Sequence, residues 1–251
     1  MEWPEGLSTG DVQWRQMKDA VAAARPEILL TNELPFGAWL AEGAGYSEDE
    51  ARTSIRAHEK GLEGLIELGL PAVISSRPVR NGERLANEAF VLEKGVVRPL
   101  HRKQYFPNEP GWFESEWYAG DDSGFDVADV RRLKVGVLVC TEAMFNERAR
   151  AYGKQNASLL VIPRASGMDI EPWKIAGAMA SLVAGAYVVS SNRVGSARGG
   201  TQFGGGGFAY APQGRLVAVT DRDHPVRTLE VDPEVSAAAQ REYPCYVAER
   251  E

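Results

Sequence analysis

In the first part of the chain, apolar residues are spaced as in an amphipathic helix and then form a short continuous stretch typical of a buried strand. This order of helix and strand occurs twice. Apolar residues recur every three to four positions in a first helical segment that stops at Pro26, and they are Trp14, Met17, Val21 and Ala24. The run 28–31 reads as a buried strand. A capping box at Ser47 opens a second helix that Gly69 closes, and 71–75 is the next predicted strand.

The middle of the chain has the pattern of an antiparallel meander. Asn81-Gly82 is a strong hairpin turn and Lys94-Gly95 is a weaker one, and they border predicted strands at 86–92 and 96–102. A loop rich in aromatic and acidic residues is expected at 103–122.

The second half returns to alternating strands and helices. We expect strands at 134–139, 159–162, 186–190, 208–211, 216–220 and 226–231. Asn146 caps a helix, Pro172 starts another at its favoured first position, and Asp232 opens a short final helix. A glycine-rich loop is expected at 193–207. This order predicts an α/β protein with mixed sheets, and since no linker or repeat is visible we expect one domain over residues 1–251.

Composition excludes several classes of protein. The 251 residues are 44% apolar and 25% charged, which suits an ordered globular chain with a sizeable core. The net charge of −7 argues against a nucleic-acid partner. The two cysteines do not make a disulfide scaffold, and they favour a reducing compartment. Since the start lacks the pattern of a signal peptide and the apolar stretch 179–189 is too short to cross a membrane, we expect a cytoplasmic protein with no membrane partner.

Three chemically complementary side chains come directly after apolar strands. Glu33 follows the run 28–32, Lys103 follows 96–102, and Cys140 follows 135–139. Because active sites of α/β folds assemble at the carboxyl ends of strands, these residues are candidates for one site.

The three residue types suit acyl transfer by a thiol. A free thiol with a pKa of about 8.5 is mostly protonated at neutral pH, and a neighbouring carboxylate can accept its proton during attack. A positioned donor at the resulting oxyanion contributes roughly 10²–10³ in rate, and Lys103 and the backbone N–H of Thr141 are candidate donors. A catalytic pair of cysteine and histidine is disfavoured, because the chain has only three histidines.

Three segments, in order, resemble those of the nitrilase superfamily of carbon–nitrogen hydrolases. They read TNELPF at 31–36, HRKQYFP at 101–107 and VCTEAMFNE at 139–147. Weaker similarities follow at 159–163, at 191–195 and over 206–214, so the resemblance covers about residues 12 to 220.

This resemblance implies a four-layer α-β-β-α sandwich of two mixed sheets flanked by helices, with no cofactor. It implies that Glu33 is the base, Cys140 the nucleophile and Lys103 the oxyanion partner. It also implies a second carboxylate beside the lysine, for which Glu114 is the better match and Glu116 the competitor. The family commonly forms dimers, here through helices near 146–155 and 173–185. The chain departs from the family in having little room for a strand before its first helix.

Further residues are candidates for binding a substrate, and each has a structural alternative. Glu142 either lines the site or caps the following helix. Trp112 and Phe113 either wall the substrate pocket or pack their loop onto the core. Arg164 is a candidate ligand for a substrate carboxylate. No His, Cys or Asp cluster has the spacing of a metal site.

The sequence therefore predicts an amidase that converts a small linear amide to its acid and ammonia through a thioester on Cys140. Nitrile and N-carbamoyl substrates are alternatives on the same three residues. An isochorismatase-like hydrolase also orders an acid, a lysine and a cysteine, but the meander at 86–102 and the use of Glu33 disfavour it. A non-catalytic binding subunit on this scaffold is the alternative from another class.

Overall fold

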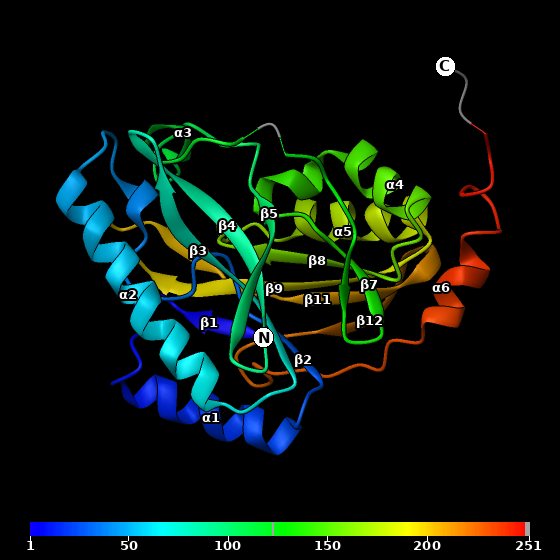
Figure 1. Cartoon of the computed structure of the whole chain (residues 1–251), viewed down its shortest axis with the longest axis horizontal. Coiled ribbons are helices and arrows are strands. Elements are labelled where there is room, and N and C mark those ends of the chain that lie inside the picture. The colour runs from blue at the N-terminus through cyan, green and yellow to red at the C-terminus, as the bar shows by residue number, and fades with distance from the viewer. Residues whose placement is uncertain (122, 249–251) are drawn as a thin grey trace.

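The computed structural model describes residues 1–121 and 123–248, and it has four layers (Figure 1). Two β-sheets pack against each other, α1 and α2 cover the outer face of one sheet, and α4 and α5 cover the outer face of the other (Figure 1). The predicted α-β-β-α sandwich of two mixed sheets is therefore confirmed. Within the described ranges, no helix is both long enough and apolar enough to cross a membrane.

The smaller sheet has the strand order β2-β3-β4-β5. Its elements are α1 (Val12–Ala24), β2 (Ile28–Leu30), α2 (Glu48–Glu67), β3 (Ala72–Asn81), β4 (Arg84–Glu93) and β5 (Val96–Arg102). Trp14, Met17 and Val21 are the buried residues of α1, as their spacing predicts. Both predicted hairpin turns are present, because Gly82 connects β3 to β4 and Lys94-Gly95, both with positive φ, connect β4 to β5.

The larger sheet has the order β12-β11-β9-β8-β7-β6, and β1 and β10 also pair with β9. Its strands are β1 (Glu2–Pro4), β6 (Ala128–Val130), β7 (Leu133–Val137), β8 (Leu159–Arg164), β9 (Tyr187–Ser196), β10 (Gln202–Gly204), β11 (Phe208–Ala211) and β12 (Arg215–Val219). The remaining helices are α3 (Glu114–Trp117), α4 (Asn146–Lys154), α5 (Glu171–Ala184) and α6 (Pro233–Ala239). The 3-10 turns are η1 (Leu40–Glu42), η2 (Cys140–Met144) and η3 (Pro212–Gly214).

The structure corrects four sequence-based expectations. The segment 226–231 is not a strand, although its apolar residues suggest one. The glycine-rich loop at 193–207 is largely a hairpin, in which β9 continues to Ser196 and pairs antiparallel with β10. A first strand does exist, because β1 pairs parallel with β9. The expected loop at 103–122 contains the helical turn α3, and its last residue lies outside the described part of the chain.

The core between the sheets joins the strands that precede the three candidate catalytic residues. Leu30 of β2, Ile74 of β3, Val91 of β4 and Val137 of β7 belong to one buried cluster. Because this packing aligns the two sheets face to face, the loops that follow β2, β5 and β7 come together at one end of the sandwich.

Candidate active site

The loop that carries Glu33 is held in a constrained conformation by the neighbouring sheet. Leu34 has φ 49°, a left-handed conformation that is costly for a residue with a branched side chain. The Ser76 hydroxyl accepts a hydrogen bond of 2.8 Å from the backbone N–H of Leu34. The guanidinium of Arg193, in β9, donates to the carbonyls of Glu33 and Leu34. These contacts fix the direction in which the Glu33 carboxylate points.

Lys103 lies between two carboxylates in the interior. Its Nζ is 2.8 Å from Oε1 of Glu33 and 2.5 Å from Oε2 of Glu114, and all three side chains have 0% exposure. Glu116 instead accepts a hydrogen bond from the backbone N–H of Gly45. Of the two candidate partners for Lys103, the structure therefore places Glu114 beside it.

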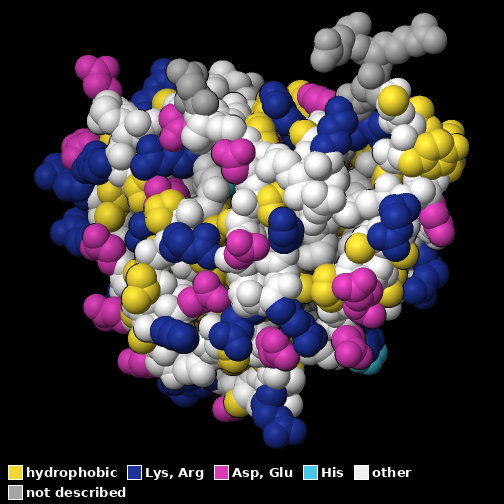
Figure 2. Space-filling view, turned by 45° about the vertical axis from the view of Figure 1, so that its right-hand side comes forward, with side chains coloured by type: hydrophobic (Ala, Val, Ile, Leu, Met, Phe, Trp, Pro, Cys, Tyr) yellow, Lys and Arg dark blue, Asp and Glu magenta, His cyan; other side chains and the backbone are white. Residues whose placement is uncertain are grey.

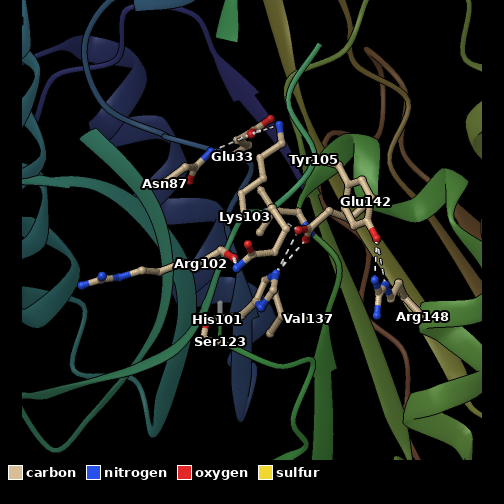
Figure 3. A network of polar contacts seen from close by, with 12 residues as sticks. Glu33, Asn87, His101, Arg102, Lys103, Tyr105, Ser123, Val137, Glu142 and Arg148 are labelled. Atoms are coloured by element: carbon tan, nitrogen blue, oxygen red, sulfur yellow. Dashed lines mark hydrogen bonds and ion pairs between the residues drawn. The ribbon is translucent and has the colours of Figure 1, made fainter. Parts of the chain in front are cut away.

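Several polar atoms around this ion pair have no hydrogen-bond partner in the described part of the chain. Oε1 of Glu33 accepts from Nδ2 of Asn87 at 2.7 Å and from Lys103, as Figure 3 shows, whereas Oε2 of Glu33 has no partner. Oε1 of Glu114 and the hydroxyl of Tyr118 are also buried and unpartnered. Since buried polar groups normally find partners, this cluster favours a polar ligand.

Cys140 begins the turn η2 and has φ 50°. Such left-handed strain in a residue with a side chain is concentrated at functional positions. Its side chain is 2% exposed, and Sγ lies 3.8 Å from the carbonyl oxygen of Ala165, to which the thiol donates. Ala165 directly follows β8, so the nucleophile candidate is held between two adjacent parallel strands.

Burial, together with the charge of Glu33, keeps the thiol of Cys140 protonated. Burial raises the pKa of Cys140, the negative charge of Glu33 raises it further, and Lys103 lowers it. Burial also raises the pKa of Glu114 to about 8, against the opposing effect of Lys103. For Lys103, burial acts to lower the pKa, but Glu114 and Glu33 outweigh it and the pKa is raised well above its usual value. The ammonium is therefore retained, and a base is needed to activate the thiol.

Glu142 connects the nucleophile turn to the loop that carries the lysine. Its carboxylate accepts from the backbone N–H of Val139 and of Gln104, each at 2.7 Å, and from Nε2 of His101 at 2.9 Å (Figure 3). Both carboxylate oxygens thus bond to the residues next to Cys140 and Lys103. Glu142 was a candidate for contacting substrate, and this geometry favours a positioning role instead.

Arg164, at the end of β8, is buried, and among the residues that the structure describes it has no carboxylate partner. Its three nitrogens donate to the hydroxyls of Ser190 and Ser166 and to the carbonyl of Gly206, at 2.7–2.8 Å. Burial lowers the pKa of Arg164 to about 10. Because the protein already engages each nitrogen, this arrangement favours a role in holding β8, β9 and the 206 loop together.

Trp112 and Phe113 line an open cavity of about 540 Å³ next to the site. The indole Nε1 of Trp112 donates at 3.1 Å to the carbonyl of Ala165, the same oxygen that accepts from Cys140. The walls of the cavity do not include Cys140 itself. Thr141, the residue after the nucleophile, is half-buried.

Sequence reasoning did not assign a role in the site to Asn87 or His101. Asn87 lies inside β4 between Ala86 and Glu88, where nothing in the sequence distinguishes it from an ordinary polar strand residue. In the described ranges, no group of three His, Cys, Asp or Glu side chains is arranged to hold a metal ion.

Comparison with known protein families shows to which family the chain belongs. The profile of the carbon-nitrogen hydrolase family matches residues 58–241. The chain belongs to the carbon-nitrogen hydrolase family. The matched region includes Lys103, Glu114 and Cys140, and Glu33 lies before it.

Curated relatives of this carbon-nitrogen hydrolase include two amidases. N-carbamoylputrescine amidase from Solanum lycopersicum is 30% identical over 185 residues, covering 66% of this chain and 61% of that protein. An (R)-stereoselective amidase from Pseudomonas sp is 25% identical over 183 residues, covering 72% of this chain and 65% of that protein. The chain thus spans less than two thirds of the length of these relatives.

Solved structures of the family share the fold. A carbon-nitrogen hydrolase from Helicobacter pylori G27 has a TM-score of 0.81 at 21% identity, covering 98% of this chain and 92% of that one. An amidase from Nesterenkonia sp. has a TM-score of 0.71 at 20% identity, covering 87% of this chain and 84% of that one.

Proposed function

We propose that the protein is an amidase that hydrolyses a small linear amide to its carboxylic acid and ammonia. The observation that carries this proposal is the buried assembly of Lys103 between Glu33 and Glu114, with Cys140 close enough for the charges of Glu33 and Lys103 to act on its thiol. The family match and the amidases among the relatives support the same reaction class.

The unpartnered Oε2 of Glu33 is the atom available to take the thiol proton. As the proton moves to Glu33, Sγ of Cys140 attacks the amide carbon. Lys103 and the backbone N–H of Thr141 stabilise the oxyanion. When the tetrahedral intermediate collapses, the carbon–nitrogen bond breaks, the proton on Glu33 passes to the leaving nitrogen, and ammonia departs from a thioester. Glu33 then takes a proton from water as the oxygen of that water attacks the thioester carbon. When the second tetrahedral intermediate collapses, the carbon–sulfur bond breaks, the proton on Glu33 passes to Sγ of Cys140, and the acid is released.

Replacement of the nucleophile tests this proposal. We expect the wild-type protein to release ammonia from at least one amide in a screen of linear amides, and Cys140→Ser to lower that rate by at least about a thousandfold. Cys245→Ser is the matched control and should keep the wild-type rate, because Cys245 lies near the C-terminus and bonds only to carbonyls of α5. Ammonia release by Cys140→Ser at the wild-type rate would rule out the thioester mechanism.

An N-carbamoyl amide is the second candidate substrate, and the similarity to N-carbamoylputrescine amidase favours it. Hydrolysis of such a compound releases an amine and carbon dioxide in addition to ammonia, whereas a simple amide yields an acid. Measurement of amine release alongside ammonia therefore distinguishes the two substrate classes. Nitrile hydrolysis on the same residues remains a third outcome of the screen.

We also propose that two copies associate through the outer face of α5. This face leaves Ile175 and Met179 exposed at 68% and 41%, and the nearby Met144 of η2 is exposed at 40%. α4 and α5 lie next to each other on the outer layer of the sandwich (Figure 1). An apolar surface of this kind on an outer layer is typical of an interface between protomers.

A further inference from the structure

The cavity beside the active site has one charged residue in its wall. The wall consists of Pro110, Gly111, Trp112, Phe113, Gly167, Met168, Gly199, Gly200, Thr201, Gln202 and Glu42, so the carboxylate of Glu42 supplies its only formal charge. Both oxygens of this carboxylate face the loop across the cavity, where Oε2 accepts from the N–H of Gly199 at 2.7 Å and Oε1 from the N–H of Thr201 at 2.9 Å. Glu42 is therefore held in one orientation.

Glu42 carries a negative charge that no basic side chain neutralises. Within residues 1–121 and 123–248, it forms no ion pair with a lysine or an arginine. Burial acts to raise its pKa, but the hydrogen bonds from Thr201 and Gly199 outweigh this effect and the pKa is lowered. Each carboxylate oxygen has two lone pairs, so each can accept a second hydrogen bond from a ligand.

The residues that flank the cavity wall make the charge balance more negative. Glu109 precedes Pro110 and Asp169 follows Met168, whereas Arg198 is the one basic residue directly next to a wall segment. All three are exposed. The surface around the opening therefore attracts a cation and repels an anion.

Trp112 contacts both the wall of the cavity and the segment beside the reaction centre. One edge of its indole lies against Gly167, where a Cβ atom would be 3.3 Å from the ring, and the indole N–H donates to the carbonyl of Ala165 beside Cys140. On the other side, Phe113 precedes Glu114, and its backbone N–H donates at 2.8 Å to the carbonyl of Ala41, next to Glu42. Trp112 and Phe113 therefore lie between the cavity that Glu42 borders and the residues Cys140 and Glu114.

We infer that Glu42 and Trp112 form a subsite for a positively charged group at the far end of the substrate. The inference rests on the proposed amidase function and narrows its substrate class to linear amides with a terminal ammonium. The carboxylate of Glu42 pairs with the ammonium, and the indole face of Trp112 provides a cation–π surface beside it.

Binding to a catalytically inactive protein tests the subsite independently of turnover. Calorimetry on Cys140→Ala should compare three amides of the same length: 5-aminopentanamide, pentanamide and 4-carbamoylbutanoate, which are cationic, neutral and anionic. We expect 5-aminopentanamide to bind about tenfold more tightly than pentanamide, as a partly exposed charge pair and a cation–π contact together provide, and 4-carbamoylbutanoate to bind most weakly. Adding Glu42→Gln should remove the preference for the cation and leave the affinity for pentanamide unchanged.

Glu116→Gln is the matched control, because Glu116 is also a half-buried carboxylate that accepts a backbone N–H but is not part of the cavity wall. It should keep the preference for the cation. Equal affinities for the cationic and neutral amides, weak binding of all three, or an equal loss for both amides in Glu42→Gln would each overturn the inference. The proposed function fails separately, if wild-type protein releases no ammonia from any amide although the amides bind to Cys140→Ala.

Discussion

At the scale of the residue, the site depends on a few side chains whose polar atoms are used in different ways. Oε1 of Glu33 is occupied by Lys103 and Asn87, whereas its Oε2 is unpartnered and available for a proton. Glu142 has the opposite character, because both of its oxygens are saturated by donors from the protein. The first pattern suits a group that takes part in chemistry, and the second suits a group that holds others in place.

Glu142→Gln tests this distinction. Glutamine has one acceptor oxygen, so its NH₂ group must face at least one of the donors on Val139, Gln104 and His101, which costs about 1–3 kcal/mol of stability. We expect kcat to fall by at least about tenfold with KM nearly unchanged, because Lys103 and Cys140 lose their fixed separation. Steady-state kinetics on the best amide measure both constants.

Glu147→Gln is the control for this variant, because Glu147 is an exposed carboxylate in the first turn of α4. It should behave like the wild type. A large rise in KM with unchanged kcat in Glu142→Gln would indicate direct substrate contact and contradict the positioning role.

At the scale of the element, a buried histidine joins α2 to the loop that follows Glu33. The backbone N–H of Phe36 donates to Nε2 of His58 at 3.4 Å, so Nδ1 carries the hydrogen and donates at 2.8 Å to the carbonyl of Ser54 in the preceding turn. Burial lowers the pKa of His58 to about 4 from its usual 6.5. The neutral ring is therefore part of the folded state.

His58→Gln should change how stability depends on pH. The unfolded chain gains a proton at His58 near pH 6.5 and the folded chain only near pH 4, so the wild type loses this contribution as the pH falls through that interval. We expect the gap in unfolding free energy between the wild type and His58→Gln to shrink from pH 7 to pH 4. Urea unfolding at several pH values measures it, with His224→Gln, which replaces an exposed histidine, as the control. A gap that stays constant over this interval would contradict the assignment.

Elements defined by local chemistry were predictable, and elements defined by distant contacts were not. The hairpin turns follow from Gly82, Lys94 and Gly95, which adopt positive φ, and α1 follows from the spacing of its apolar face. β1 has only three residues and no period, so its pairing with β9 could not be read from the chain. The segment 226–231 has the apolar content of a strand but finds no partner strand.

The same limit applied to the site. Glu33, Lys103 and Cys140 were predictable because each follows the end of an apolar strand, and their meeting at one end of the sandwich is a property of the fold class. Asn87 and Glu42 could not be predicted. The role of an amide within a strand, or of a carboxylate in a short turn, depends on the residues that the tertiary structure places next to it.

At the scale of the whole molecule, charged and apolar surfaces are the two kinds of candidate for an interface. On the face in Figure 2, basic and acidic side chains are interspersed with no continuous region of one sign, which fits a net charge of −7 spread over the surface. The exposed apolar residues of α5 and η2 are therefore better candidates for an interface than any charged patch on this face.

Charge placed on α5 tests the association of two copies. We expect the wild type to elute as a dimer in size-exclusion chromatography with light scattering, and Ile175→Asp with Met179→Asp to elute as a monomer, because two buried carboxylates would oppose the contact. Val12→Asp is the matched control, since Val12 is 56% exposed on α1 in the opposite outer layer. A wild-type protein that is monomeric at every concentration would refute the proposed interface.

The enclosure of Cys140 has a consequence for how its reactivity is measured. Because the side chain is only 2% exposed, an alkylating reagent reaches the sulfur during excursions in which the surrounding loops separate, whereas Cys245 is partly accessible in the resting fold. The ratio of the modification rates of Cys140 and Cys245 therefore reports how often these loops open. A substrate that holds the loops closed should lower the alkylation rate of Cys140 and leave the alkylation rate of Cys245 unchanged.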